Sequence, residues 1–276
     1  LDHKTSPLGS LGRLEQLALR LGQIQGTASP RLEQPQMVVF AGDHGLAARG
    51  VSAFPSDVTW QMVENFLAGG AAVSVLARQH GLALTVVDCG VARDIAPRAA
   101  VPGQPQLLVR KVAAGTQDAS IGPAMTPAQC AQALHNGMDV VRGLPGNALL
   151  LGEMGIGNTS VASLLLSRLC GVSLQDCTGA GTGLDATGVA RKRAVLAQAL
   201  AVNEGAVNPL DALAALGGFE VATLVGAVLQ ASSERRVIVV DGFITSAAVL
   251  VAARLQPHVL QRCVFAHGSA EPGHAH

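Results

Sequence analysis

The sequence is poor in aromatic residues, in charge and in long apolar runs, and each shortage argues against a class of protein. It has no Tyr, and its aromatic fraction is only 3%, so platforms for stacking nucleic-acid bases are not expected. Charged residues make up 14% and balance to a formal net charge of +0, which gives no field to collect nucleic acid or anionic lipid. No apolar run approaches the ~18 residues of a membrane-spanning helix. We therefore expect a soluble, cytoplasmic protein without nucleic-acid or membrane partners.

The chain also lacks the residue spacing of a metal or disulfide framework. None of its five cysteines forms a CxxC pair, so buried thiols in a reducing cytosol are favoured over redox or metal chemistry. The stretch "AHGSAEPGHAH" is the best metal candidate, but Pro272 and Gly273 interrupt any helical pairing and no cysteine is near. We expect no metal site there, although the stretch holds His267, Glu271, His274 and His276.

Apolar residues, by contrast, are abundant: 49% of the 276 residues are hydrophobic, enough for one large domain with an extensive core. Short β-branched runs at 37–43, 82–90, 147–153, 236–242 and 263–269 predict buried strands. Helical patterns fall near 57–80, 127–142, 159–170, 185–203, 210–231 and 244–254. This alternation predicts an α/β fold with a Rossmann-like open parallel sheet and helices on both faces.

Nearly every predicted strand ends in a polar residue beside glycine. Because ligands bind beyond the carboxyl ends of strands in open parallel sheets, we expect these residues to converge on one crevice. An ordinary role as a helix cap or turn residue is the alternative for any single one. They are Asp43, His44, Asp88, Glu153, Asp241 and His267.

The stretch "LLGEMGIGNTS" (150–160) lies between a predicted strand and a helix, where a phosphate-binding loop belongs. Its glycines would let backbone N–H groups approach an anion at a helix N-terminus. Asn158 stands where a nucleoside-triphosphate loop needs lysine, so a monophosphate is the better ligand. The alternative is a tight turn with Asn158 as the helix cap.

A second glycine cluster, "TGAGTGLD" (178–185), precedes a helix with the basic run Arg191, Lys192 and Arg193. It lacks the GxGxxG spacing and acidic partner of a dinucleotide site, which argues against an NAD(P)-dependent oxidoreductase. One basic side chain could reach back to a phosphate. For Arg191 and Arg193 a solvated helix face is favoured.

The stretch 40–62 combines small residues and a Phe with an amide early in the following helix. Ser52 and Phe54 would suit the faces of a flat apolar ligand, and Gln61 would suit a ring nitrogen at its edge.

Together these stretches resemble the nicotinate-nucleotide–dimethylbenzimidazole phosphoribosyltransferase family of cobalamin lower-ligand synthesis. The matching segments run in the family's order from residue 2 to residue 274 and include "FAGDHG", "GEMGIGNTS", "GTGLD", "GGFE", "VDGFITSAA" and "HGSAEPGH". The resemblance implies transfer of the 5-phosphoribosyl group of nicotinate mononucleotide to 5,6-dimethylbenzimidazole, giving α-ribazole 5′-phosphate and nicotinate with inversion at the anomeric carbon. It also implies no cofactor, a homodimer, and a small helical domain assembled from both chain ends. Residues 1–30 would be its N-terminal part, and residues 31–276 would form the α/β domain.

The resemblance also assigns residues. Glu153 and Asp241 would be catalytic, beside the ribose and the reacting centre, with Glu220 a further ribose-side candidate. The 5′-phosphate would be held by Gly155, Gly157, Asn158, Thr159, Lys192, Gly181 and Gly183. The benzimidazole would contact Ser52, Phe54 and Gln61.

Two departures from the family pattern bear on these expectations. Ala180 stands where the family has arginine, which removes a contact near the second glycine loop. Family members also continue for several dozen residues beyond "SAEPGH", and that extension carries the glutamate held to be their general base. A non-catalytic or impaired ligand-binding form of the same fold is therefore the alternative function.

Overall fold

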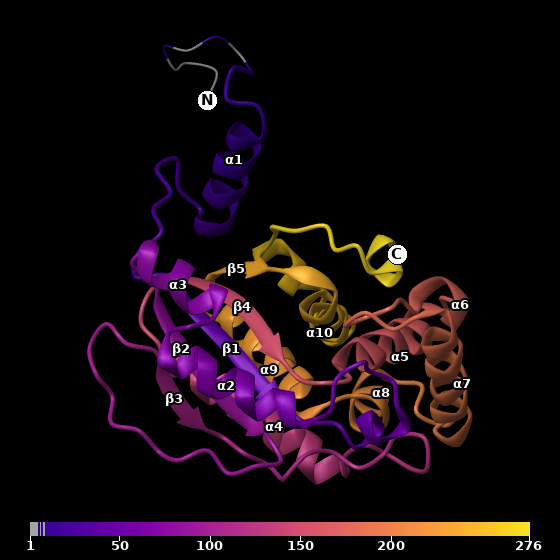
Figure 1. Cartoon of the computed structure of the whole chain (residues 1–276). Coiled ribbons are helices and arrows are strands. Elements are labelled where there is room, and N and C mark those ends of the chain that lie inside the picture. The colour runs from indigo at the N-terminus through magenta and orange to yellow at the C-terminus, as the bar shows by residue number, and fades with distance from the viewer. Residues whose placement is uncertain (1–4, 6, 8) are drawn as a thin grey trace.

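A six-stranded parallel sheet forms the centre of the protein (Figure 1), and its strand order is β3-β2-β1-β4-β5-β6. The structure, a computed structural model, describes residues 5, 7 and 9–276. The strands are β1 (Gln36–Gly42), β2 (Ala83–Gly90), β3 (Gln106–Val109), β4 (Ala148–Met154), β5 (Val237–Val240) and β6 (Cys263–Phe265). The chain runs outward from β1 to β3, returns to β4 beside β1, and runs outward again. The loops after β1 and β4 therefore diverge, which is where an open sheet of this kind has its crevice.

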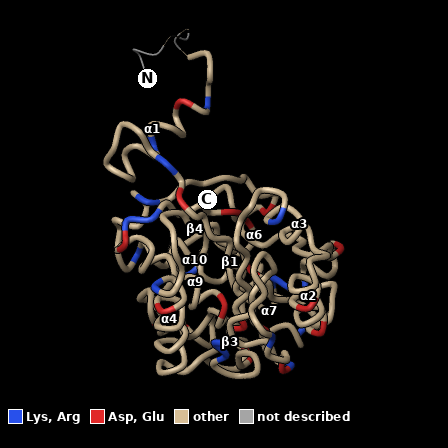
Figure 2. Tube along the Cα trace, turned by 90° about the vertical axis from the view of Figure 1, so that its left-hand side faces the viewer, with Lys and Arg blue, Asp and Glu red and all other residues tan. Residues whose placement is uncertain are grey.

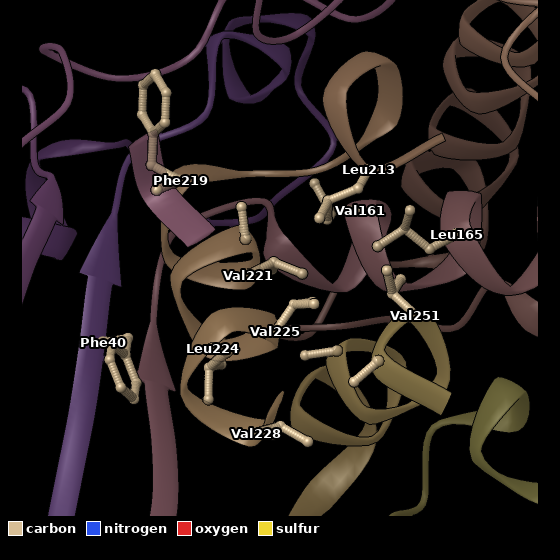
Figure 3. Close-up of a cluster of buried hydrophobic side chains, with 14 of the residues drawn as sticks. Phe40, Val161, Leu165, Leu213, Phe219, Val221, Leu224, Val225, Val228 and Val251 are labelled. Atoms are coloured by element: carbon tan, nitrogen blue, oxygen red, sulfur yellow. The ribbon is translucent and has the colours of Figure 1, made fainter. Parts of the chain in front are cut away.

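Both faces of the sheet are covered because its strands bury side chains on both sides. Along β1, Val38 and Phe40 join the cluster beneath α9 (Phe219–Ser233), whereas Val39 and Ala41 join the cluster beneath α2 (Asp57–Ala68) and α3 (Ala72–Gln79). Figure 3 shows Phe40 on the sheet side of α9. This confirms the predicted parallel sheet with helices on both faces.

Further helices surround α9 and extend the domain beyond the sheet. Next to α9 lie α4 (Pro127–Arg142) and α10 (Gly242–Leu255), and α5 (Asn158–Cys170) packs on α10. The remaining elements are α1 (Arg13–Gln25), α6 (Leu174–Cys177), α7 (Ala186–Val202), α8 (Pro209–Leu216), and the 3-10 turns η1 (Gly45–Arg49), η2 (Pro257–Arg262) and η3 (Pro272–Ala275).

Two sequence expectations about elements are wrong and one strand was not expected, each for a local reason. The predicted helix 57–80 is two helices, because Gly69 adopts a left-handed conformation with φ 81° and ends α2. The predicted helix 210–231 is also two, because the extended pair Gly217–Gly218 separates α8 from α9. The edge strand β3 was not predicted, since its four residues follow a segment rich in proline and glycine.

Helix α1 stands apart from the α/β body in Figure 1 and contacts it near its C-terminal end. Ile24 packs on Ala148 and Val237. Arg20 donates to the carbonyl oxygens of Leu260 and Cys263, and Arg262 donates to that of Ile24. The leucines at 11, 14, 17 and 19 are exposed by 38% or more. The assignment of residues 1–30 to a separate helical domain stays a prediction, and residues 1–4, 6 and 8 lie outside the described residues.

Over the part of the chain that the structure describes, no helix combines the length and apolar character needed to cross a bilayer. Basic and acidic residues are interspersed along the trace in Figure 2.

The contact between α4 and α9 is especially close, and two glycines make it possible. A Cβ atom added at Gly137 of α4 would collide with the carbonyl oxygen of Thr223 and lie 2.8 Å from the Ala227 nitrogen. A Cβ atom added at Gly226 of α9 would collide with the carbonyl oxygen of Leu134. Since these neighbours are backbone atoms, neither helix can yield without moving as a whole.

We expect Gly137→Ala to lower the free energy of unfolding by ~1–3 kcal/mol, because overpacking at a backbone contact forces the helices apart. Urea unfolding followed by circular dichroism measures it. Gly205→Ala is the matched control, because a Cβ atom there would meet nothing within 4 Å. Equal stability of the two variants would contradict the proposed helix contact.

Candidate active site

The turn between β4 and α5 places a carboxylate directly beside a helix N-terminus. Gly157 occupies the cap position with φ 98°, a left-handed conformation that favours glycine. Asn158 is therefore the first helical residue and not the cap, which corrects the alternative considered for it. Its side-chain Nδ2 donates a hydrogen bond to the Glu153 carboxylate. The turn thus holds Glu153 in place while it presents the start of α5.

Lys192 reaches this helix start from α7 and lies entirely inside the protein. Its side chain is 0% exposed, and Nζ donates to Thr159 Oγ1 at 2.8 Å and to the Gly179 carbonyl oxygen at 3.4 Å. A Cβ atom added at Gly181 would lie 2.9 Å from Thr159 Oγ1 and 3.3 Å from Lys192 Nζ. The structure therefore brings together α5, the second glycine loop and Lys192. Burial lowers the pKa of Lys192 to about 8.

The two neighbouring arginines lie in different settings. Arg191 is exposed, as expected, and its Nε donates to the Gly50 carbonyl oxygen at 3.3 Å. Arg193 is not on a solvated face: it is half-buried, its Nε is buried, and it donates to the carbonyl oxygens of Gln175 and Thr178 around α6. Of the three, only Lys192 contacts Thr159 at the start of α5.

A buried ion pair lies at the switch point between β1 and β4. His44 Nε2 lies 2.8 Å from Glu220 Oε1, and the two side chains are 1% and 0% exposed. The pair fits because glycines surround it: a Cβ atom at Gly42 would lie 2.9 Å from Glu220 Oε2, one at Gly155 would lie 3.0 Å from His44 Nε2, and one at Gly218 would collide with His44. Burial alone would lower the pKa of His44, but the surrounding carboxylates, Glu220 foremost, raise it overall.

The carboxyl group of Glu153 is a weaker acid than that of an ordinary glutamate. Burial, and then the negative charge of Glu220, raise its pKa to about 7, while the Asn158 hydrogen bond opposes the rise. Asp241, after β5, contributes further in the same direction. It is itself exposed and lies 3.1 Å from His267 Nδ1. Three carboxylates from separate strands and helices therefore lie around one point.

An apolar groove of about 600 Å³ opens beside Glu153 and Asp241. Its walls come from β1, α2, α3 and β4, and the two carboxylates are the acidic groups in its lining. Such a groove suits a flat apolar ligand whose polar edge meets the carboxylates. The apolar lining includes Met37, Val39, Met62, Phe66, Val73, Leu76, Leu82 and Leu150.

Comparison with known proteins identifies the chain as a whole. A family model described as phosphoribosyltransferase matches residues 1–276. The chain belongs to this phosphoribosyltransferase family. A relative from Variovorax paradoxus is 73% identical over 275 residues, which cover 100% of this chain and 77% of the relative. Another from Cupriavidus necator is 56% identical, covering 99% and 78%. Both relatives are named nicotinate-nucleotide–dimethylbenzimidazole phosphoribosyltransferase.

A solved structure shares the fold of this phosphoribosyltransferase. The crystal structure of CobT from Thermus thermophilus superposes with a TM-score of 0.90 at 40% identity, covering 99% of this chain and 81% of that chain. The resemblance stated from the sequence is therefore confirmed at the level of family and fold.

The acceptor-side residues expected for this phosphoribosyltransferase do not gather in the apolar groove. Ser52 Oγ lies 3.0 Å from Thr182 Oγ1 of the second glycine loop. Phe54 is 52% exposed and Gln61 is exposed on α2. Met62, next to Gln61, does line the groove. Contact of Ser52, Phe54 and Gln61 with a benzimidazole stays a prediction.

Most of the strand-end residues lie at the expected crevice of this phosphoribosyltransferase, but Asp88 does not take part in it. Asp88 Oδ1 accepts from the amides of Gly90 and Val91, so it is the turn residue considered as the alternative. Two residues to which the sequence assigned no catalytic or binding role take part in the contacts of the site. His44 pairs with Glu220, and Glu271 Oε1 accepts from the Gly181 amide at 3.0 Å. Over the described residues no group of three or more His, Cys, Asp or Glu could hold a metal ion.

The raised pKa of Glu153 predicts that this carboxyl group costs the phosphoribosyltransferase stability. Its pKa rises from 4.5 to about 7 on folding, so the folded state binds the proton more tightly and loses stability as pH rises between these values. We therefore expect Glu153→Gln to be more stable than wild type at pH 8, with the difference absent at pH 4. Urea midpoints across this pH range measure it. A pH-independent difference would contradict the assigned cause.

Proposed function

We propose that the protein transfers the 5-phosphoribosyl group of nicotinate mononucleotide to 5,6-dimethylbenzimidazole, giving α-ribazole 5′-phosphate and nicotinate. The observation that carries this proposal is the buried Lys192, whose Nζ donates to Thr159 at the start of α5, next to Asn158, which donates to the Glu153 carboxylate. The charges of Glu220 and Asp241 act on the pKa of that carboxyl group. One side of the site suits a single phosphate and the other suits a developing positive charge. The names of the most similar relatives support the same reaction.

The phosphate side uses backbone and one cation. Gly155 and the cap Gly157 precede α5, and Asn158 and Thr159 begin it, so that its N-terminal amides contribute a partial positive charge. Lys192 supplies the full charge, Gly181 lies beside Thr159 and Lys192, and the exposed Gly183 is proposed for the outer edge of the site. With Asn158 bound to Glu153, no side chain here replaces the lysine of a triphosphate loop. This arrangement supports binding of the 5′-phosphate of a mononucleotide.

The ribose side stabilises charge. When the bond from the anomeric carbon to the pyridinium nitrogen breaks, its electron pair leaves with nicotinate, and positive charge builds on the ribose. Glu153, Asp241 and Glu220 place negative charge on this side, where it stabilises the transition state more than the ground state. Attack by the azole nitrogen from the opposite face inverts the anomeric carbon. The azole's other nitrogen then loses its proton to a carboxylate base.

The acceptor fits the apolar groove. A bicyclic aromatic ring would bury its faces against the methionine and aliphatic walls and direct its nitrogen edge toward Glu153 and Asp241. Ser52, Phe54 and Gln61 are proposed for the outer rim, where Gln61 could accept a hydrogen bond from the ring. No observation favours the alternative of a non-catalytic binding form.

Assembly and location follow from the same proposal. We propose a homodimer, supported by the exposed leucines of α1, and light scattering measures the mass in solution. We place the enzyme in the cytoplasm because its cysteines are free and four of the five are buried, as in reducing compartments.

The direct test is to incubate the protein with nicotinate mononucleotide and dimethylbenzimidazole and to follow both products by chromatography. We expect nicotinate and α-ribazole 5′-phosphate in equal amounts. Nicotinate without the ribazole would indicate hydrolysis, and binding of both ligands in a calorimeter without release would indicate a binding protein. Either result would overturn the proposal.

We expect Glu153→Gln to lower kcat by ~10²-fold or more, because a neutral amide cannot stabilise the charge on the ribose. Binding of nicotinate mononucleotide through its phosphate should survive. In wild type, kcat should rise with pH as Glu153 ionises near its pKa of about 7. An unchanged kcat in the variant would remove Glu153 from the mechanism. Glu204→Gln, exposed on the surface, is the matched control.

A further inference from the structure

The segment around Glu271 is docked tightly against the second glycine loop. Glu271 Oε1 accepts from the Gly181 amide at 3.0 Å. A Cβ atom added at Gly179 would collide with Glu271 Oε2 and lie 2.7 Å from Pro272 Cδ. One added at Gly273 would lie 2.6 Å from Phe243 Cζ. The approach therefore requires glycine at position 179 of the loop and fixes the Glu271 carboxylate there, while Gly273 lets the same segment pack against Phe243 of α10.

Lys192, beside the same loop, requires a nearby negative charge to keep its proton. A buried ammonium group without opposite charge releases its proton. The two oxygens that Lys192 Nζ contacts, Thr159 Oγ1 and the Gly179 carbonyl, are both neutral. Among the charged groups of the described residues, Glu271 is the one whose field acts on the pKa of Lys192, raising it against burial.

The other elements packed around Lys192 offer no substitute for Glu271. On its own helix, Arg191 and Arg193 bond to carbonyl oxygens elsewhere. Helix α5 contributes the neutral Thr159, and the second glycine loop contributes backbone. Cys177 of α6 is a buried thiol whose pKa burial raises, so it stays neutral. Glu271 Oε2 is buried and has no hydrogen-bond partner among the described residues, which leaves its charge to act through space.

We propose that Glu271 is a positioning residue for the phosphate site, where its carboxylate fixes the second glycine loop through Gly181 and supplies the negative charge that keeps Lys192 protonated. This inference rests on the proposed function, because the phosphate site is part of it. Glu271 does not itself bind the phosphate, which its charge would repel. It acts through the loop and the lysine.

The consequence is a pH window for phosphate binding. A phosphate monoester becomes a dianion above pH ~6, and Lys192 loses its proton above a pKa of about 8. Binding should therefore be strongest between these values. Without the charge of Glu271, the pKa of Lys192 falls further and the upper edge of the window moves to lower pH.

Glu271→Gln tests this, because the amide oxygen can still accept from Gly181 while the charge is lost. Calorimetry with nicotinate mononucleotide, and with inorganic phosphate as a minimal probe, should be run from pH 6 to 9. We expect the upper limb of the affinity profile to move down by about one pH unit, which weakens binding about fivefold at pH 8, ~10-fold at pH 9 and little at pH 6. Glu204→Gln, an exposed glutamate, should keep the wild-type profile.

Two further outcomes make the result decisive. If the upper limb of the affinity profile of Glu271→Gln stays where it is in wild type, the proposal is overturned. Tighter binding at every pH would also overturn it, because it would show that the carboxylate competes with phosphate. If Glu271→Gln does not fold, Glu271→Asp keeps the charge on a shorter side chain and should retain a limb near that of wild type, whereas a limb shifted by a full unit would contradict the charge role.

Failure of this inference and failure of the proposed function can be told apart. If wild type releases nicotinate but Glu271→Gln keeps its pH profile, the function stands and the role of Glu271 falls. If the limb moves but wild type forms no ribazole phosphate, the positioning role stands and the reaction does not.

Discussion

The contact between His44 and Glu220 is the interaction around which the site is arranged. It places opposite charges inside the protein at the point where β1 and β4 part, and three glycines leave just enough room for it. Removing either partner would leave the other charge buried and unpaired. This destabilises a protein more than replacing both partners with apolar residues. The pair also affects the acidity of Glu153, because after burial the charge of Glu220 is the largest cause that raises the pKa of this carboxyl group, while His44 lowers it. The close packing at these three glycines and the acidity of Glu153 are therefore linked through one buried contact.

Lys192 and Glu153 show how one short turn can serve two opposite electrostatic needs. Both are drawn away from their ordinary pKa values mainly by burial, the lysine downward and the carboxyl upward. As a result both titrate close to neutrality. The start of α5 separates them: Thr159 contacts the lysine, and Asn158 contacts the carboxylate. Neighbouring residues of one helix thus keep the lysine and the carboxylate apart.

The sequence was a good guide to the elements and residues whose signal is local. Runs such as 147–153 combine aliphatic residues with a glycine-rich turn, so β4 and α5 could be predicted together with the turn between them. The helix ends at Gly69 and Gly217 could not be predicted, because a glycine can also lie inside a helix, and residue type does not determine the left-handed conformation of Gly69 or the extended one of Gly217. The importance of Glu271 could not be read locally either, since its partner Gly181 lies in a loop far away along the chain. Residue spacing in the sequence predicts roles that depend on neighbouring residues of the same turn. Roles that depend on contacts between distant parts of the chain become visible only in the folded structure.

The strand order carries a consequence for how the molecule forms. The central strand β1 pairs on one side with β4, so that residue 36 meets residue 149, and the ion pair joins residues 44 and 220. Contacts so distant along the chain are slow to form and cannot begin until most of the polypeptide has left the ribosome. Until then β1 has one edge open and His44 has no partner. The contact of His44 with Glu220 therefore has to wait until the chain as far as α9 is available, and until β4 is also available the second edge of β1 is open to pairing with other chains.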